Sequence, residues 1–80
     1  MQVVLKHEVH RAKNGYCASA YGIGLAVYGI SPEVAKRNLE RTVLLLLQPF
    51  QRQGVLEQEL ASIPVEIVED DDAALSVVAL

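Results

Sequence analysis

The sequence has one cysteine and two histidines among its 80 residues, and it lacks a long uninterrupted apolar run. Cys17 cannot form a disulfide within the chain, which suits the reducing cytoplasm. The start of the chain, residues 1–6, has neither the basic region nor the apolar core of a secretory signal. The longest uncharged stretch, residues 14–32, contains four glycines and a proline, so it predicts strands and turns instead of a membrane helix. We therefore expect a cytoplasmic protein that does not enter the membrane.

Positive charge is absent from the last third of the chain. All seven Lys and Arg lie in residues 1–54 beside three glutamates, whereas residues 55–80 contain seven acids and no base. The basic part can meet an acidic partner, and the acidic part a basic one. The alternative is that the two parts attract each other within the fold, and we expect this second arrangement.

Groups for catalysis or metal binding are scarce as well. His7 and His10 lie three residues apart in a predicted strand, so they point to opposite faces and cannot share a metal ion. Cys17 has no positively charged neighbour to activate its thiol, and we interpret it as a small strand residue. The acids of residues 70–72 lack the spaced ligands and the glycine of a calcium loop. We expect no enzyme, no cofactor and no metal site.

The N-terminal part of the chain has the pattern of three antiparallel strands. Residues 2–11 alternate between apolar and polar side chains, as in a half-buried strand. Asn14-Gly15 predicts a hairpin turn, because both residues tolerate a positive φ. A second strand over 16–21, a glycine turn and a third strand over 25–28 complete the meander.

A long amphipathic helix follows the meander. Ser31 is suited to cap its first turn, and Pro32 to stand at its first position, where no amide is needed. Pro49 removes an amide, so we expect the helix to kink or stop near Leu47. At 100° per residue a narrow apolar arc predicts the buried face: Ala35, Leu39, Val43, Leu46 and Phe50.

The C-terminal part is less regular. A short helix over 55–61 and a fourth strand over 65–68 are predicted, whereas residues 73–80 are equally compatible with a strand, a helix or a tail. We predict one α+β domain over 1–80, with a core of 2–69 and an acidic turn and apolar tail over 70–80. Its three-stranded meander and fourth strand carry the helix on one face. The predicted core residues are Val3, Leu5, Val9, Ala18, Val27, Ala35, Leu39, Val43, Leu46 and Ile67.

The order of these motifs resembles the N-terminal domain of HicB-like antitoxins over residues 2–54. The matching positions are Asn14, Gly15, Tyr16, Gly24, Gly29, Ser31, Glu33, Ala35 and Asn38. The resemblance implies a β-β-β-α-β domain related to a partial ribonuclease H fold, usually dimeric or larger. It also implies a partner, a small RNA-cleaving HicA-type toxin with a double-stranded-RNA-binding fold. Operon-repressing relatives also carry a DNA-binding domain, and we expect this chain to be a stand-alone form without one.

Two functions from different classes follow from these observations. The first is a non-enzymatic interaction module that occludes a small basic toxin, with a partner surface at Glu66, Glu69, Asp70, Asp71 and Asp72. The second is a nucleic-acid or regulatory binding domain that uses the basic residues of 1–54, although a pI near 5.2 argues against nucleic acid. An orphan oligomeric domain is a further alternative. Leu44 projects from the polar side of the helix and Leu47 lies near its border, so we predict a homodimer, or a higher oligomer, through these two residues.

Overall fold

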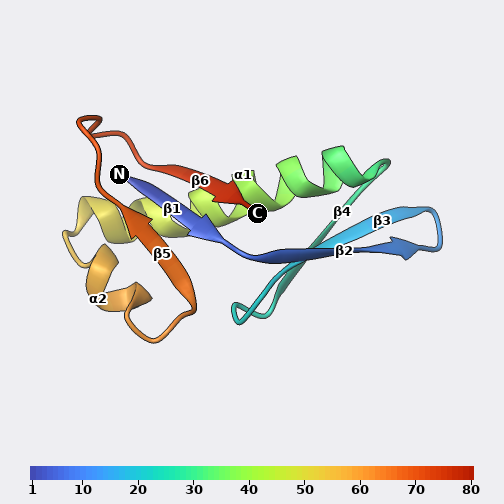
Figure 1. The fold of residues 1–80 in the computed structure, drawn as a ribbon, viewed down its shortest axis with the longest axis horizontal. Coiled ribbons are helices and arrows are strands. Elements are labelled where there is room, and N and C mark those ends of the chain that lie inside the picture. Colours follow the sequence, from blue (N-terminus) through green and yellow to red (C-terminus); the bar gives the residue numbers. More distant parts are fainter.

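The computed structural model describes all residues, 1–80, and contains six strands and two helices. The strands are β1 (Gln2–Leu5), β2 (His7–Ala12), β3 (Gly15–Ala20), β4 (Leu25–Gly29), β5 (Val65–Val68) and β6 (Ser76–Ala79). The helices are α1 (Pro32–Arg52) and α2 (Leu56–Leu60). The molecule is elongated, 39 × 23 × 19 Å, with the β2–β3 hairpin at one end and α2 at the other (Figure 1). Neither helix has the length and apolar character needed to cross a membrane.

The strands form two three-stranded sheets that are joined by a nearly continuous stretch of chain. β1 and β2 are separated only by Lys6, and each is part of a different sheet. In sheet A (β5-β1-β6), β1 pairs antiparallel with β5 and parallel with β6. In sheet B (β2-β3-β4), both pairings are antiparallel. The predicted meander is present as sheet B, but its predicted first strand, 2–11, is divided at Lys6, and residues 2–5 belong to sheet A.

The hairpin turn of sheet B lies one residue earlier than we predicted. Ala12 pairs with Gly15, so Lys13 and Asn14 are the two turn residues. Neither has a positive φ, whereas Gly15 has a φ of 157°. The predicted position of the turn, centred on Asn14-Gly15 with positive φ angles, was wrong, but the predicted hairpin is present.

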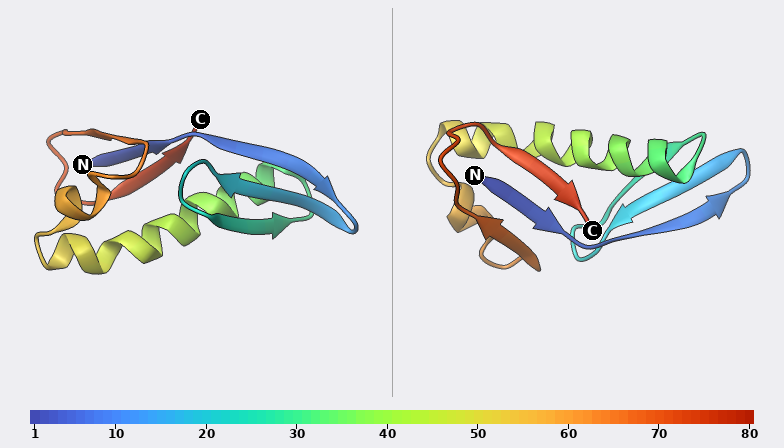
Figure 2. Two further views of the ribbon diagram at one scale, coloured as in Figure 1. Left: turned by 90° about the horizontal axis from the view of Figure 1, so that it is seen from below. Right: turned by 45° about the horizontal axis from the view of Figure 1, so that its top comes forward.

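α1 runs along the length of the molecule beside both sheets (Figure 2). Ser31 caps the helix as predicted: its Oγ accepts a hydrogen bond from the Val34 N–H at 3.2 Å, and Pro32 is the first helical residue. The buried side chains of α1 recur every four residues, at Ala35, Leu39, Val43 and Leu47. This helix is the main element that connects sheet B with β6 of sheet A.

The helix ends at Arg52 and does not stop near Leu47. The missing amide of Pro49 would have bonded the carbonyl of Leu45 in a regular helix. Leu45 is largely exposed, so water can bind that carbonyl. The helical hydrogen bonds resume afterwards, since the Gln53 N–H donates to the Pro49 carbonyl at 3.1 Å.

The core consists of apolar side chains alone. Its buried members are Val3, Leu5, Ala18, Ala20, Ala35, Leu39, Val43, Leu47, Leu56, Leu60, Leu75, Val77 and Ala79. Six of the ten predicted core residues are among them, and Val9, Val27 and Ile67 are half-buried against this cluster. Leu46 was wrong, because its side chain is 53% exposed whereas that of Leu47 is 8% exposed.

The C-terminal part completes sheet A. The predicted strand over 65–68 is present as β5, but it pairs with β1 and does not extend the meander. Residues 76–79 form β6, the strand on the other side of β1. Leu75, Val77 and Ala79 are buried, so the core reaches beyond the predicted limit at residue 69 and residues 73–80 are not a loose tail. The α+β class is confirmed, but the single four-stranded sheet is wrong.

Candidate interaction surfaces

One end of the molecule is acidic. Its seven acidic side chains come from α2, β5 and the loop that joins β5 to β6: Glu57, Glu59, Glu66, Glu69, Asp70, Asp71 and Asp72. All seven residues are exposed. α2 and the loop lie at the same end of the ribbon in Figure 1. The chain thus gathers its C-terminal acids into one region of the surface.

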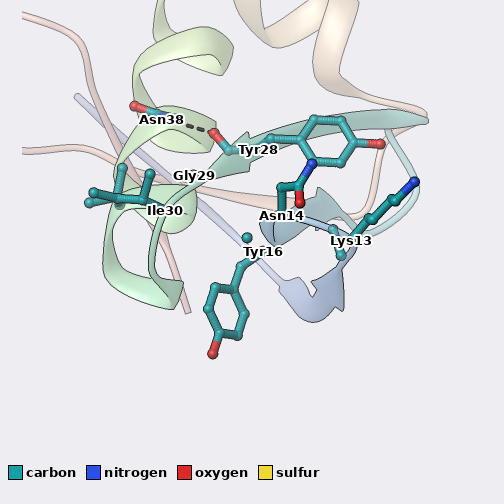
Figure 3. A pocket seen from close by; sticks show the side chains of 10 residues that line it. Lys13, Asn14, Tyr16, Tyr28, Gly29, Ile30 and Asn38 are labelled. Atoms are coloured by element: carbon teal, nitrogen blue, oxygen red, sulfur yellow. Dashed lines mark hydrogen bonds between the residues drawn. The ribbon is translucent and has the colours of Figure 1, made fainter.

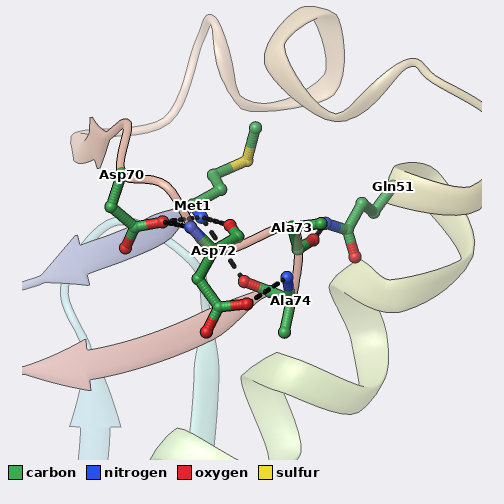
Figure 4. Close-up of polar contacts among 6 residues, drawn as sticks. All are labelled: Met1, Gln51, Asp70, Asp72, Ala73 and Ala74. Atoms are coloured by element: carbon green, nitrogen blue, oxygen red, sulfur yellow. Dashed lines mark hydrogen bonds and ion pairs between the residues drawn. The ribbon is translucent and has the colours of Figure 1, made fainter.

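Two of the five predicted partner-binding acids stabilise this loop. Asp70 Oδ1 accepts hydrogen bonds from the N-terminal amine of Met1 at 2.6 Å and from the Asp72 N–H at 3.0 Å (Figure 4). Asp72 Oδ1 accepts from the Ala74 N–H at 2.9 Å. The hydrogen bond from the amine, followed by that from the Asp72 amide, lowers the pKa of Asp70 below its usual value. These contacts fix the loop beside the start of β1.

The side chains of the other three predicted acids, Glu66, Glu69 and Asp71, form no hydrogen bond or ion pair within the chain. The two ion pairs of the molecule join Met1 to Asp70, and His10 to Glu8 when the imidazole is protonated. None of the seven Lys and Arg side chains is in an ion pair, so ion pairs do not supply the attraction that we expected between the two parts of the chain. The basic and acidic parts are separate in the sequence. They also lie mainly at different ends of the molecule, because α1 spans the distance between the hairpin end and the other end.

Five of the seven basic residues lie toward the hairpin end, whereas Lys6 lies between β1 and β2 and Arg52 is the last residue of α1, at the acidic end. Lys13 is in the hairpin turn, Arg11 is in β2, and Lys36, Arg37 and Arg41 are in the first half of α1. A shallow groove of about 680 Å³ lies between the hairpin turn and the start of α1. Tyr28 and Ile30 line it and are 67% and 84% exposed.

Figure 3 shows how the groove is built. The Tyr28 ring lies beside the turn residue Asn14, whereas the Tyr16 ring points away on the other side of the sheet. Asn38 of α1 donates from Nδ2 to the Tyr28 carbonyl at 2.8 Å and so holds the end of β4 against the helix. The groove is therefore lined by an aromatic ring, an exposed isoleucine and a lysine.

The outer face of sheet B brings together residues that the sequence reasoning treated separately. The register places His10 opposite Cys17, and Cys17 opposite Tyr28. His10 Nε2 lies 3.1 Å from Glu8 Oε2, but no hydrogen bond joins His10 to the Cys17 thiol. The hairpin register, which pairs residues whose numbers add to 27, could have revealed that His10 lies opposite Cys17, and the β3–β4 register adds Tyr28. His7 lies on the opposite face, as predicted.

The chemistry of this row is limited. An activated nucleophile requires a base within hydrogen-bond reach, and Cys17 has none. Across the whole chain, no three His, Cys, Asp or Glu side chains converge where they could hold a metal ion. The row presents polar and aromatic groups on the outer face of sheet B, and of its three residues only Tyr28 lines the groove.

The two leucines predicted for self-association are not on a free surface. Leu47 is buried, and Leu44 is partly buried against the core, where it shares a shallow depression with Leu75 and Val77. The segment that includes β6 therefore covers this side of the helix. The most exposed side chains of the five-residue apolar run are those of Leu45 and Leu46.

The sequence and the fold were compared with known proteins. No protein family, no curated protein and no solved structure matches this chain.

Proposed function

We propose that this protein is a non-enzymatic binding module whose acidic end binds a small basic protein. The observation that carries this proposal is the absence of ion pairs between the C-terminal acids and the seven Lys and Arg side chains of the same chain. Carboxylates that are not neutralised within a fold retain their field for an incoming partner. A surface of one sign accelerates association with a surface of the opposite sign.

The resemblance to HicB-like antitoxins supplies the class of partner. If β1 and β2 are counted as one bent strand, the order of that strand, β3, β4, α1 and β5 follows the β-β-β-α-β arrangement of the family. α2, which precedes β5, and β6, which follows it, are then additions. On this basis we propose a HicA-type toxin as the partner, with Glu66, Glu69 and Asp71 as the acids that face it. The free, half-buried Cys17 suits action in the reducing cytoplasm.

Binding of a HicA-type toxin whose catalytic histidine has been replaced tests this proposal. Stopped-flow measurements at low and high salt separate steering from short-range contacts. The double variant Glu69→Lys, Asp71→Lys should associate about tenfold more slowly at low salt, and the difference should shrink as salt is added. Glu8→Lys makes the same kind of charge change at the hairpin end and should have little effect. If the toxin does not bind, or if Glu8→Lys slows association equally, the acidic end is not the partner surface.

A second function, binding of single-stranded nucleic acid, is favoured by one observation. Tyr28 is exposed in a groove with Lys13, which is an arrangement for stacking a base beside a phosphate contact. Fluorescence anisotropy with a labelled single-stranded RNA tests it. Binding that weakens steeply with salt and is lost in Tyr28→Ala would favour this function over the first. No binding at 50 mM salt would exclude it.

A further inference from the structure

The backbone of β2 has hydrogen-bonding groups that the fold leaves unpaired. In an antiparallel ladder, alternate residues direct both their N–H and C=O groups to the same neighbour. The Tyr21 N–H donates to the Lys6 carbonyl, so the even-numbered residues of β2 direct their N–H and C=O groups toward β3. Val9 and Arg11 therefore direct their N–H and C=O groups to the open edge of sheet B. No hydrogen bond outside the strand ladders reaches these groups.

Two of the other sheet edges are protected by side chains of α1. At the edge of β6, the Ala79 N–H donates to Glu40 Oε2 at 2.9 Å. At the edge of β4, the Tyr28 carbonyl accepts from Asn38 Nδ2 at 2.8 Å. Such side chains block the pairing of an edge with another strand. β2 lies on the margin away from α1, as both views of Figure 2 show. No side chain forms a hydrogen bond with the outward backbone groups of Val9 or Arg11.

We propose that two copies of this chain associate through β2, antiparallel and about a twofold axis at His10. The edge is closed at His7, because its N–H already donates to the Leu80 carbonyl at 3.2 Å. This leaves Val9 and Arg11, each with one donor and one acceptor. If Val9 of one copy faces Arg11 of the second copy, all of these groups pair in four hydrogen bonds. The strand of the second copy then ends at its Ala12, opposite Glu8, before it reaches the closed position.

Of the two edge strands without such protection, β2 and β5, the charges favour β2 as the place where a second copy pairs. This strand carries one acid, Glu8, and one base, Arg11, so two copies can approach without net repulsion. The remaining open edge, β5, is shorter and carries Glu66, with Glu69 and Asp70 directly after it. Two such acidic edges would repel each other. Each His10 in the β2 pair keeps its own Glu8 carboxylate beside it.

The resulting assembly is a continuous six-stranded sheet, β4-β3-β2 followed by the same strands in reverse order. Its contact is mainly between backbones and is smaller than the 1,200–2,000 Å² typical of a stable complex. We therefore expect association at high micromolar concentration and above. The acidic ends point away from the axis, so failure of this pairing leaves the proposed toxin-binding surface untouched, and the reverse is also true.

Cysteine cross-linking tests the register directly. In a Cys17→Ala background, His10→Cys places two thiols at directly opposed positions, where the Cα atoms are about 4.5 Å apart and a disulfide can form. Glu8→Cys is the matched control, because its two copies would lie about 13 Å apart along the strands. On mild oxidation, His10→Cys should give a disulfide-linked dimer and Glu8→Cys should not. Equal cross-linking of both variants, or of neither, would overturn the proposal.

A proline substitution tests the hydrogen bonds. Arg11→Pro removes an amide that β3 does not use, and an edge strand tolerates proline at such a position. Sedimentation equilibrium up to about 1 mM should show the wild-type mass rising toward twice that of the chain. Arg11→Ala keeps the amide and should retain this behaviour, whereas Arg11→Pro should lose it. A wild-type chain that remains a monomer would refute the pairing even if Arg11→Pro does not fold.

Discussion

Gly29 lies at the closest approach between sheet B and the start of α1. A Cβ atom at this position would lie 2.4 Å from the Ala35 backbone nitrogen and 2.7 Å from its Cα. These atoms belong to the helix backbone and cannot move aside like the end of a flexible side chain. Gly29 and Ala35 together let the helix lie directly on the strand, and the other helix contacts depend on this approach.

Gly29→Ala should therefore destabilise the protein by about 1–3 kcal/mol or more, because the helix must move away from β4. For a chain of this size, each kcal/mol corresponds to a shift of roughly 4–8 °C in the thermal midpoint. Gly24→Ala is the matched comparison: Gly24 has a φ of 73°, but a Cβ there meets no atom within 4 Å. Its effect should be limited to about 1–2 kcal/mol from the left-handed conformation. A Gly29→Ala protein as stable as Gly24→Ala would show that this close approach is not needed.

At the scale of the element, the buried stripe of α1 turns around the helix. A step of four residues advances about 40° beyond a full turn, so the stripe from Ala35 to Leu47 rotates steadily. The helix needs this rotation because it packs on β4 near Asn38 and against the β6 segment near Leu44. A helical wheel with one fixed buried direction cannot represent two sheets with different orientations. That is why it placed Leu46 in the core and Leu44 on the surface.

The neighbouring leucines 46 and 47 should respond very differently to truncation. Leu47→Ala removes a buried side chain and should lower the free energy of unfolding by about 2–5 kcal/mol. Leu46→Ala alters an exposed side chain and should change it by about 0.5 kcal/mol or less. Urea titrations of the two variants measure both values under the same conditions. Similar losses, or a larger loss for Leu46→Ala, would contradict the packing of α1.

Local chemistry was sufficient to predict some elements but not their partners. Ser31 and Pro32 specify the start of α1, and the alternation over residues 2–11 specifies which side chains of β1 and β2 face inward. A stop of α1 near Leu47 was wrong, because the helix can continue past Pro49 when water reaches the Leu45 carbonyl that the missing amide leaves unpaired. β6 could not be assigned because its four residues pair with a strand more than 70 positions away. The free edge of β2 is likewise visible only when the pairing of every strand is known.

At the scale of the whole molecule, the same elements hold both sheets in place. β1 continues into β2, and α1 contacts both β4 and β6. The turn between β3 and β4 also touches the segment before β5, since a Cβ on Gly22 would lie 2.4 Å from Pro64 Cγ. The distribution of charge is also a property of the whole molecule. The sequence shows a basic part and an acidic part, but only the structure shows that no ion pair joins their side chains. Loss of one sheet should therefore remove the support of the other.

The last prediction is that sheets A and B unfold together. The chain has no tryptophan, and its three tyrosines, Tyr16, Tyr21 and Tyr28, lie in sheet B or in the turn between β3 and β4. Tyrosine fluorescence thus reports on sheet B alone. Leu5 is 1% exposed in the central strand of sheet A, so Leu5→Ala should cost about 2–5 kcal/mol there.

In a two-state protein, the tyrosine signal of Leu5→Ala should shift to lower urea by the same amount as the circular dichroism of α1. The reason is structural: sheet B cannot keep α1 in place once β6 and β1 have separated from it. An unchanged tyrosine midpoint beside a lowered dichroism midpoint would mean that sheet B and the first turns of α1 form an independent unit. The bend at Lys6 would then separate two folding units.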